Sequence, residues 1–228
     1  MERRPGKVDR PGVRAGYDRW SEAYDDTPNP LVALDRRYTM RLLRPRRGER
    51  ILDAGCGTGA NLRLMLGSRS NPIGVDFSLG MLRVARRRLA SVPLVQVDLD
   101  DHLPLRSRVF DAVLCALVGE HLTNPARFFR EAFAALLPGG RFVFSVFHPE
   151  MAAAGIEANF EREGVEYRLG AYRHTVADYL SAMDDASFRR LHVREFRGDE
   201  ALVSEVSWAA KYVGRPLLLA VEAWRSAR

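Results

Sequence analysis

The spacing of apolar residues changes along the chain, and this change predicts the fold class. From residue 50 onwards, short apolar runs rich in β-branched and aromatic residues, typical of strands, alternate with amphipathic segments of helical spacing. The runs are ILDAG, NPIGVDF, PLVQVDL, FDAVLCAL and RFVFSVF, and the helical segments lie at residues 60–66, 81–90 and 125–137. Such alternation predicts βαβ units and therefore an α/β fold, in which a parallel sheet carries helices on both faces.

Further elements are expected before this alternation. Tyr17, Trp20 and Tyr24 share one face of a predicted helix, and a second helix is expected over residues 31–43. Residues 1–14 are rich in Arg, Pro and Gly and have no apolar period. They are therefore expected to form a flexible tail.

The rest of the chain, residues 15–228, is expected to form a single domain. Within it, residues 149–175 depart from the alternation after the fifth strand, and their alternating apolar and polar positions predict a surface hairpin that is a candidate lid. A helix over residues 175–183 and strands over residues 190–196 and 216–224 are expected to follow.

The composition excludes several classes of protein. The chain has 228 residues, of which 46% are hydrophobic, and this is enough apolar material for a packed core. It contains no apolar run of the length that a membrane span or a signal peptide needs, so a cytoplasmic protein is expected. Two cysteines, Cys56 and Cys115, cannot supply a four-thiolate zinc site, and the five histidines lack the HExxH spacing. No metal site is therefore expected.

The net charge of +6 raises the question of a nucleic-acid partner. Arginine clusters occur at residues 44–47 and 86–88, but almost all basic residues of the chain are Arg, as a general compositional preference would produce. We interpret the clusters as solvated helix faces rather than as a track for phosphates, and expect nucleic acid not to be the partner. A nucleic-acid substrate stays open as an alternative.

The segment ILDAGCGTGANL carries the strongest chemical signal. A strand ends at Asp53, the glycines Gly55, Gly57 and Gly59 follow at alternate positions, and a helix begins directly after them. Glycines there allow the backbone to approach a ligand closely, and the first turn of a helix offers free N–H groups. Asp76 ends the second strand, where a carboxylate can accept both hydroxyls of a ribose. A nucleotide-like ligand is predicted, and these features alone suit a nicotinamide dinucleotide as well.

Three further features resemble the class I S-adenosylmethionine-dependent methyltransferases of the small-molecule type, which include the enzymes of ubiquinone and menaquinone biosynthesis. First, the glycine loop has an acidic residue before it, Asp53, and a third glycine, Gly59. Second, Asp98 and Leu99 end the third strand. Third, the segment LLPGG stands before the fifth strand. The resemblance extends over about residues 17–224. It implies a Rossmann-like, doubly wound, seven-stranded and mostly parallel sheet with a C-terminal antiparallel strand, and an N-terminal helical lid over residues 15–45.

The resemblance also implies which residues bind S-adenosyl-L-methionine and its product S-adenosyl-L-homocysteine. They come from the glycine loop, the ends of the next strands and the helical lid: Asp53, Gly55, Cys56, Gly57, Gly59, Asp76, Phe77, Asp98, Leu99, Ala116, Leu117, Tyr17 and Tyr24. Simpler interpretations remain for some of them. Asp76 is also placed to cap the next helix, one of several acids near Asp98 serves as a cap, and the two tyrosines also suit core packing.

Catalytic groups are expected at the carboxyl ends of the strands, where ligands of open α/β sheets lie. His148 follows the fifth strand and is predicted to be a general base for a hydroxyl acceptor, since an imidazole titrates near neutral pH. His121 follows the fourth strand and is the second catalytic candidate, although the resemblance favours a role in shaping the cofactor pocket. Glu120, Tyr172 and His174 are candidate substrate-binding residues.

The sequence thus favours a methyltransferase that acts on a small molecule, such as a biosynthetic or secondary metabolite. Oxygen is the favoured methyl acceptor, with nitrogen or carbon possible, and the protein is expected to be a monomer or homodimer without a membrane partner. An RNA methyltransferase and a non-catalytic cofactor-binding protein on the same fold are alternatives. A nicotinamide-dependent dehydrogenase is a more distant one. The sequence identifies neither the substrate nor the acceptor atom.

Overall fold

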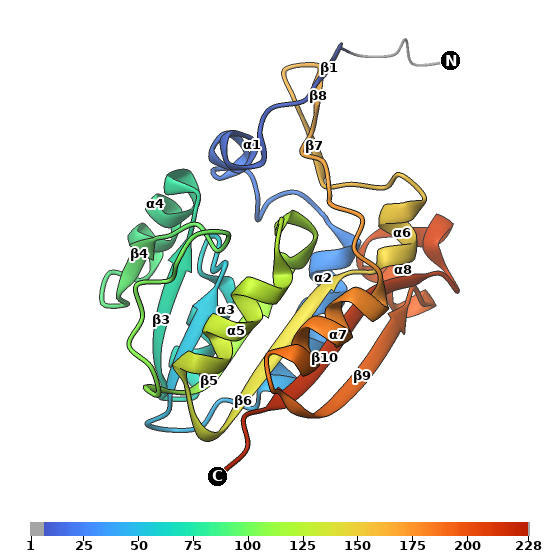
Figure 1. Cartoon of the computed structure of the whole chain (residues 1–228). Coiled ribbons are helices and arrows are strands. Elements are labelled where there is room, and N and C mark those ends of the chain that lie inside the picture. Colours follow the sequence, from blue (N-terminus) through green and yellow to red (C-terminus); the bar gives the residue numbers. More distant parts are fainter. Residues whose placement is uncertain (1–6, 228) are drawn as a thin grey trace.

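The computed structural model describes residues 7–227 and is built around one seven-stranded sheet (Figure 1). The strand order is β4-β3-β2-β5-β6-β10-β9. The first five of these strands run parallel to one another, and β10 is antiparallel to both of its neighbours. The strands are β2 (Arg50–Ala54), β3 (Asn71–Asp76), β4 (Leu94–Gln96), β5 (Phe110–Ala116), β6 (Leu136–Phe147), β9 (Arg189–Arg197) and β10 (Pro216–Trp224). This arrangement confirms the predicted fold class.

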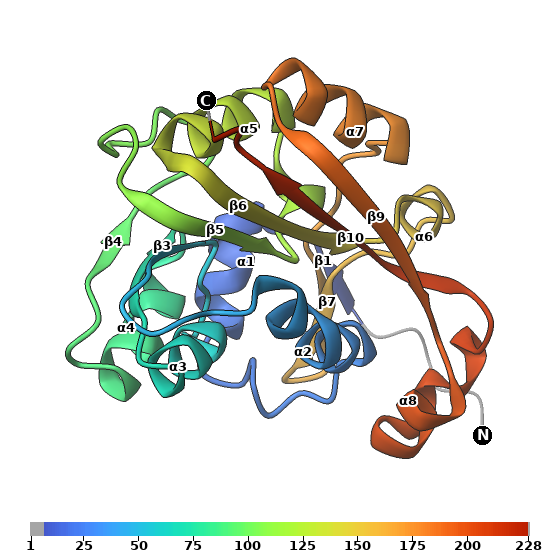
Figure 2. The same ribbon diagram turned by 90° about the horizontal axis from the view of Figure 1, so that it is seen from below.

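Helices cover both faces of the sheet, as Figure 2 shows from below. Neighbouring residues of a strand point to opposite faces, so Ile51 packs with α2, α3 and α4, whereas Leu52 packs with α5 and α7. Both faces are therefore apolar, which explains the continuous apolar runs. The helices are α2 (Pro30–Leu43), α3 (Ala60–Gly67), α4 (Leu79–Arg88), α5 (Pro125–Ala135) and α7 (Val176–Asp185), with the short α6 (Pro149–Ala153), α8 (Glu200–Glu205), η1 (Gly119–His121) and η2 (Ser207–Tyr212).

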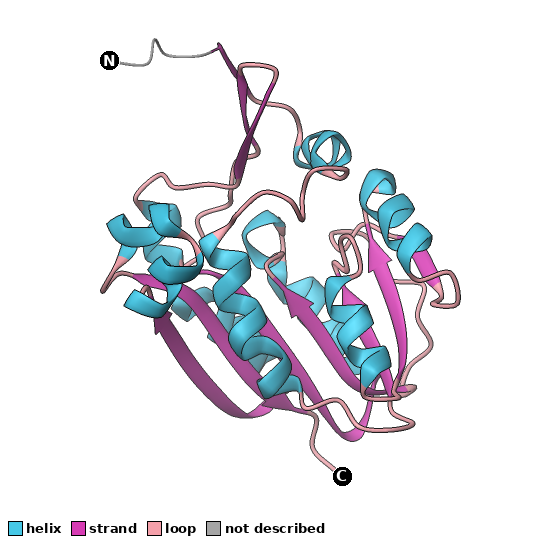
Figure 3. Cartoon of the chain, turned by 180° about the vertical axis from the view of Figure 1, so that it is seen from behind, coloured by secondary structure: helices cyan, strands magenta, loops and turns pink. Residues whose placement is uncertain are grey.

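The N-terminal residues form a second, smaller sheet (Figure 3). Strand β1 (Lys7–Asp9) pairs in parallel with β8 (Val165–Arg168), which pairs with β7 (Asn159–Arg162) in the expected hairpin. Helix α1 (Val13–Trp20) follows β1. The expectation of a flexible tail over residues 1–14 is therefore wrong for residues 7–14, while residues 1–6 lie outside the described part. The partner strand of β1 is distant in sequence, so no local pattern announces the pairing.

The ends of two further elements differ from expectation. Helix α5 ends at Ala135, and β6 begins at Leu136, so the LLPGG segment belongs to the strand rather than to the end of the helix. Helix α1 ends at Trp20, before Tyr24, and it begins four residues before Tyr17. Tyr24 therefore lies in the connection to α2 instead of on the first helix.

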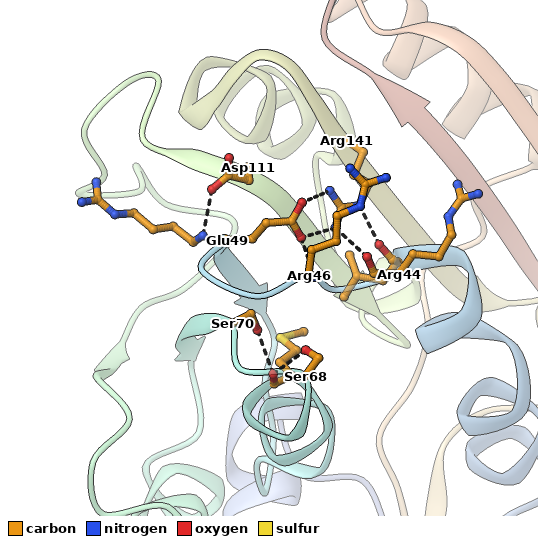
Figure 4. A network of polar contacts seen from close by, with 10 residues as sticks. Arg44, Arg46, Glu49, Ser68, Ser70, Asp111 and Arg141 are labelled. Carbon is orange, nitrogen blue, oxygen red and sulfur yellow. Dashed lines mark hydrogen bonds and ion pairs between the residues drawn. The ribbon is translucent and has the colours of Figure 1, made fainter.

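A polar network fixes the amino-terminal edge of the sheet (Figure 4). The Arg141 guanidinium at the start of β6 donates to both carboxylate oxygens of Glu49, at 2.8 and 2.6 Å, and to the carbonyls of Leu43 and Arg44. Arg44 in turn forms an ion pair of 2.6 Å with the buried Glu222 of β10. These contacts join the end of α2 to β6, to β10 and to the residue before β2. The carboxylates of Glu49 and Glu222 each have an arginine partner.

Candidate active site

A cavity lies at the opposite edge, where β2, β3 and β5 end. Parallel strands place their carboxyl ends at the same edge of a sheet, and the loops that follow them converge there. Twelve of the sequence-predicted site residues line this cavity: Tyr17, Tyr24, Gly55, Cys56, Gly57, Asp76, Phe77, Asp98, Leu99, Ala116, Leu117 and His121. The structure thus brings together residues that are up to about a hundred positions apart in sequence.

The glycine loop between β2 and α3 forms one wall. Gly57 has a φ of +52°, a left-handed conformation that favours glycine, and a side chain built there would meet nothing within 4 Å. Gly59 has a φ of +85° and lies against α4, where an added Cβ would come within 2.8 Å of Leu89. Gly59 therefore serves the packing of the loop, and it does not line the cavity.

Asp76 organises the floor of the cavity. Its Oδ2 accepts the N–H of Gly57 at 2.9 Å and its Oδ1 accepts the N–H of Ser78 at 2.8 Å. Burial raises the pKa of Asp76 to about 6, and these backbone bonds oppose the rise. Helix α4 has its own cap, since the Ser78 hydroxyl accepts the N–H of Met81. Asp76 keeps unused lone pairs, and it lines the cavity.

Asp53 is enclosed beneath the loop. It is 0% exposed and does not line the cavity, and both of its carboxylate oxygens lack a hydrogen-bond partner among the described residues. Burial, and then the charges of Asp76 and Asp35, raise its pKa to about 8. A buried carboxylate without a partner is costly. Its presence beside a cavity suits a ligand that carries positive charge.

The segment of residues 13–29, here called the N-terminal segment, closes one side of the cavity. The Tyr17 hydroxyl lies 2.9 Å from Nε2 of His121, and the Tyr17 ring contacts that of Phe77. Asp18 accepts both the Ser78 hydroxyl and the N–H of Gly80 at 2.7 Å, which fixes α1 to the start of α4. The two tyrosines thus line the cavity and do not lie in the main core.

Ion pairs add to this attachment. Arg87 binds Glu22 at 2.6 Å, Arg88 binds Asp25, and Arg14 of α1 binds Asp98 at 2.7 Å. The second arginine cluster lies on a solvated helix face, as expected, because all three of its side chains are exposed. Two of the three also form ion pairs with the N-terminal segment.

Comparisons with known proteins agree with this geometry. The family model described as a methyltransferase domain matches residues 52–144. A demethylmenaquinone methyltransferase of Clavibacter sepedonicus is 37% identical over 155 residues, which cover 64% of this chain and 60% of the relative. An uncharacterized methyltransferase of Emericella nidulans is 31% identical over 246 residues, which cover 86% of this chain and 85% of the relative. The crystal structure of an S-adenosylmethionine-dependent methyltransferase from Mesorhizobium loti has a TM-score of 0.73 and 28% identity, and the match covers 86% of this chain and 100% of that one.

The chain belongs to the class I S-adenosylmethionine-dependent methyltransferases. It spans about 60% of the length of the C. sepedonicus relative. The cofactor of this family, S-adenosylmethionine, carries a sulfonium, an ammonium and a ribose. The unpartnered Asp53, the free lone pairs of Asp76 and the open side of Gly57 fit a molecule of this kind. Within residues 7–227 of the methyltransferase, no helix has both the length and the apolar character needed to cross a membrane.

The structure corrects the expected role of His148. The side chain does not line the cavity of the methyltransferase and is fully buried. Its Nδ1 accepts the N–H of Glu150 as the cap of α6, and its Nε2 lies 3.5 Å from the carboxylate of Glu195 on β9. The His148 N–H donates to the Leu217 carbonyl, so the chain leaves β6 still paired with β10. The burial and contacts of His148 give no support to a role as the general base.

The other predicted catalytic and substrate-binding residues of the methyltransferase have different positions. His121 lines the cavity, and burial lowers its pKa to about 4, so the ring is neutral near pH 7. His174 contacts the Leu122 carbonyl at 2.7 Å, and Tyr172 is exposed, with its N–H bonded to the carbonyl of Glu120. Neither of these two residues lines the cavity, which corrects the expectation that they bind substrate.

Glu120 is buried just outside the cavity of the methyltransferase. Its Oε2 has no hydrogen-bond partner among the described residues, and burial raises the pKa of Glu120 to about 7. The carboxyl group is close enough to Tyr17 and Tyr24 to raise their pKa values. It does not line the cavity, where a substrate-binding residue was expected.

Sequence reasoning missed the wall that α2 and the preceding connection contribute. Asp25, Val32, Asp35 and Arg36 all line the cavity of the methyltransferase. A signal was present for Asp35, because it stands four residues after Leu31 on the apolar face of a predicted helix, where a carboxylate is out of place. The other lining residues that were not predicted are Thr58, Ala60, Asn61, Met81, Asp100, Val118 and Leu122.

Proposed function

We propose that this methyltransferase transfers a methyl group from S-adenosylmethionine to a small molecule, with oxygen as the acceptor atom. The observation that carries the proposal is the extent of the cavity, which continues from the glycine loop to Val32, Asp35 and Arg36 on α2. A second cavity shares Tyr24, Val32 and Arg36 with it. The two cavities therefore adjoin along α2, and an acceptor can lie there beside the cofactor.

The cofactor roles of the single residues belong to the same proposal. Asp76 holds the ribose hydroxyls, Phe77 lies against the adenine, and Asp98 with Leu99 binds the adenine edge. The glycine loop, with Asp53, Ala116 and Leu117, surrounds the methionine part. When bound, S-adenosylmethionine supplies a methyl group on a positively charged sulfur, so the chain's own residues mainly position the acceptor and exclude water.

Residues 15–45 act in this proposal as the lid of the cofactor site. The support comes from Tyr17 and Tyr24, which line the cavity, and from the contacts of Asp18 with α4. Residues 149–175 hold the lid from outside, because Phe160 of the hairpin stacks on Trp20 with ring centroids 4.9 Å apart. The insertion thus supports the lid and does not border the acceptor.

The arginine contacts favour a small molecule over RNA. Arg86 donates to the carbonyls of Ala90 and Val92, and Arg87 and Arg88 bind carboxylates of the N-terminal segment. Guanidinium groups that are engaged in this way are not free to neutralise phosphates, which is the main source of affinity for nucleic acid. The likeness to a demethylmenaquinone methyltransferase favours a biosynthetic role.

Calorimetric titration with S-adenosylhomocysteine, with NAD⁺ as the comparison ligand, tests the cofactor assignment. The wild type should bind the former and not the latter. Asp76→Ala should weaken S-adenosylhomocysteine binding at least tenfold, since a charged acceptor contributes about 1.5–3 kcal/mol. Unchanged affinity in a folded variant would contradict the ribose assignment.

Transfer of a tritiated methyl group tests the reaction itself. Label should enter members of a panel of phenols and carboxylic acids, and it should not enter total RNA. Binding of the cofactor without transfer to any compound in a broad panel would instead favour a non-catalytic protein on this fold.

A further inference from the structure

Asp35 on α2 has an arrangement that the cofactor does not explain. The side chain is 3% exposed and lines the cavity. The hydroxyls of Thr39 and Ser145 both donate to its Oδ1, the latter at 2.6 Å. Among the described residues, no hydrogen bond or ion pair reaches Oδ2, and Oδ2 is not enclosed in the way that the oxygens of Asp53 are. One oxygen is thus fixed, and the other is available to a molecule in the cavity.

The position of Asp35 separates it from the proposed adenine end. Its partner Ser145 lies on β6, whereas Phe77 and Asp98 follow β3 and β4, on the other side of β2 and β5 in the sheet. The carbonyl of Ser145 accepts the N–H of Leu117, a cavity residue with a φ of +56°. A left-handed leucine is uncommon and marks a backbone that its surroundings hold in place. Asp35 therefore faces the end of the cavity where methyl transfer would take place.

The charge of Arg36 favours the ionised form of Asp35, but Arg36 forms no ion pair with it. Arg36, the next residue, is ion-paired with Asp25. The carboxyl groups of Asp53 and Glu120 are close enough to interact with Asp35 unfavourably. Burial raises the pKa of Asp35, and the two hydroxyl bonds partly offset this rise. A carboxylate in such surroundings is stabilised by an N–H or O–H donor and has an increased tendency to take a proton.

We propose that Oδ2 of Asp35 binds the methyl acceptor through the O–H or N–H group that becomes methylated, and that it takes the proton of this group. The proton of the hydroxyl, or of the ammonium form of an amine, passes to Oδ2. The electron pair left on oxygen or nitrogen forms the bond to the methyl carbon, while the bond from that carbon to the sulfonium sulfur breaks and its electron pair stays on the sulfur of S-adenosylhomocysteine. The acceptor is thus a hydroxyl or amine compound and not a carbon acid. This inference rests on the proposed function, since it assigns the acceptor site of the same reaction.

Binding of small probes to the chain saturated with S-adenosylhomocysteine tests the assignment. Phenol and toluene have nearly the same shape, as do benzylamine and ethylbenzene, but only the first of each pair has a donor. The wild type should bind at least one donor probe about tenfold more tightly than its partner by NMR titration, as one hydrogen bond to a charged group provides. The pair that shows the preference distinguishes a hydroxyl acceptor from an amine.

Asp35→Asn is the decisive variant. Its amide oxygen still accepts from Thr39 and Ser145, so the fold is retained, but an N–H₂ group replaces Oδ2. The preference for the donor probe should fall below threefold, while the affinity for S-adenosylhomocysteine stays within threefold of wild type. Asp111→Asn removes one carboxylate at a strand position remote from the cavity, and it should change neither quantity.

Three results overturn the inference. The first is a wild type without preference for either donor probe, and the second is an Asp35→Asn variant that keeps the preference. The third is a tenfold loss of S-adenosylhomocysteine affinity in Asp35→Asn, which would make Asp35 a cofactor ligand. In all three cases the wild type still binds S-adenosylhomocysteine, so the cofactor assignment survives. A wild type that does not bind it at all contradicts the proposed function itself.

Once the methyl-transfer panel provides an acceptor, kinetics give a second readout. Asp35→Asn should lower kcat by roughly 10²–10⁴, as expected for loss of a general base, with KM raised by the lost hydrogen bond. A variant with unchanged kcat would contradict proton transfer to Asp35.

Discussion

The two edges of the sheet differ in whether their acidic side chains have a charged partner. At the amino-terminal edge, Glu49 and Glu222 each have an arginine partner at 2.6 Å. At the carboxyl-terminal edge, Asp53 and Glu120 have oxygens that find no partner among residues 7–227, and burial raises the pKa of both. Arg36 also lines the cavity at this edge, but its ion pair is with Asp25.

The paired acidic side chains serve the stability of the fold, and the unpaired ones serve ligand binding. A paired buried charge holds elements together, whereas an unpaired one costs folding free energy until a partner arrives. The carboxyl groups at the carboxyl-terminal edge therefore hold protons near neutral pH, and a ligand with positive charge favours their ionised form. A ligand that binds only the folded chain also stabilises it, and should do so most when these carboxyl groups are ionised.

Removal of Arg141 should have the largest effect on stability. Arg141→Ala leaves the carboxylate of Glu49 unpaired and frees two carbonyls at the end of α2, which should cost about 3 kcal/mol. Urea unfolding without ligand measures this loss. The double variant Arg141→Met, Glu49→Met should recover a large part of it, and a single variant as stable as wild type would show that the amino-terminal edge does not depend on this pair.

The carboxyl-terminal edge should make stability depend on pH. The pKa of Asp53 is raised to about 8 in the folded chain, so the folded chain holds a proton that the unfolded chain releases near pH 4. Stability is then lost as the pH rises from about 4 to about 8, by more than 1 kcal/mol. Asp76 and Glu120, with pKa values raised to about 6 and 7, act in the same direction.

Unfolding of Asp53→Asn at several pH values checks this dependence. As the pH rises from 5 to 8, between the unfolded and the folded pKa of Asp53, the variant should lose less stability than the wild type. Parallel pH profiles for the two chains would show that Asp53 does not titrate in this range.

The contact between α1 and α4 should affect binding more than stability. A Cβ at Gly80 would meet the Asp18 carbonyl at 2.8 Å, so Gly80→Ala displaces α1 from the start of α4. We expect S-adenosylhomocysteine affinity to fall about tenfold, or about 1.4 kcal/mol, because the tyrosine wall of the cavity moves. Gly67→Ala at the end of α3, where an added Cβ meets nothing, is the matched control. Equal affinities of the two variants for S-adenosylhomocysteine would show that binding does not depend on the position of α1.

The exposed ion pair of Arg14 and Asp98 should have the smallest effect. Half of the Arg14 side chain is exposed, and pairs of this kind contribute about 0–1 kcal/mol. Arg14→Ala should therefore weaken S-adenosylhomocysteine binding by no more than about threefold by calorimetry, with a smaller effect at high salt. A larger loss would assign Arg14 a direct contact with the cofactor.

The sequence predicted those features of the site that residues close together in the chain determine. Gly57 and Asp76 were found because a strand, a glycine turn and a helix are encoded by neighbouring residues. The burial of His148 was not foreseen because its contacts with Leu217 of β10 and Glu195 of β9 come from strands much later in the chain. Asp35 was overlooked because its partner Ser145 comes from another part of the chain.

The pairing of β1 with β8 has a consequence for the order of folding. Arg10, just after β1, binds Glu157, just before β7, and the two residues are 147 positions apart in sequence. Contacts between such distant segments form late in folding, because closing a long loop costs conformational entropy. The contacts of Asp18 with the start of α4 join segments that are much closer in sequence, so they can form before β1 pairs with β8. The cover of the cavity is thus fastened in two stages, first to α4 and then to residues 157–168.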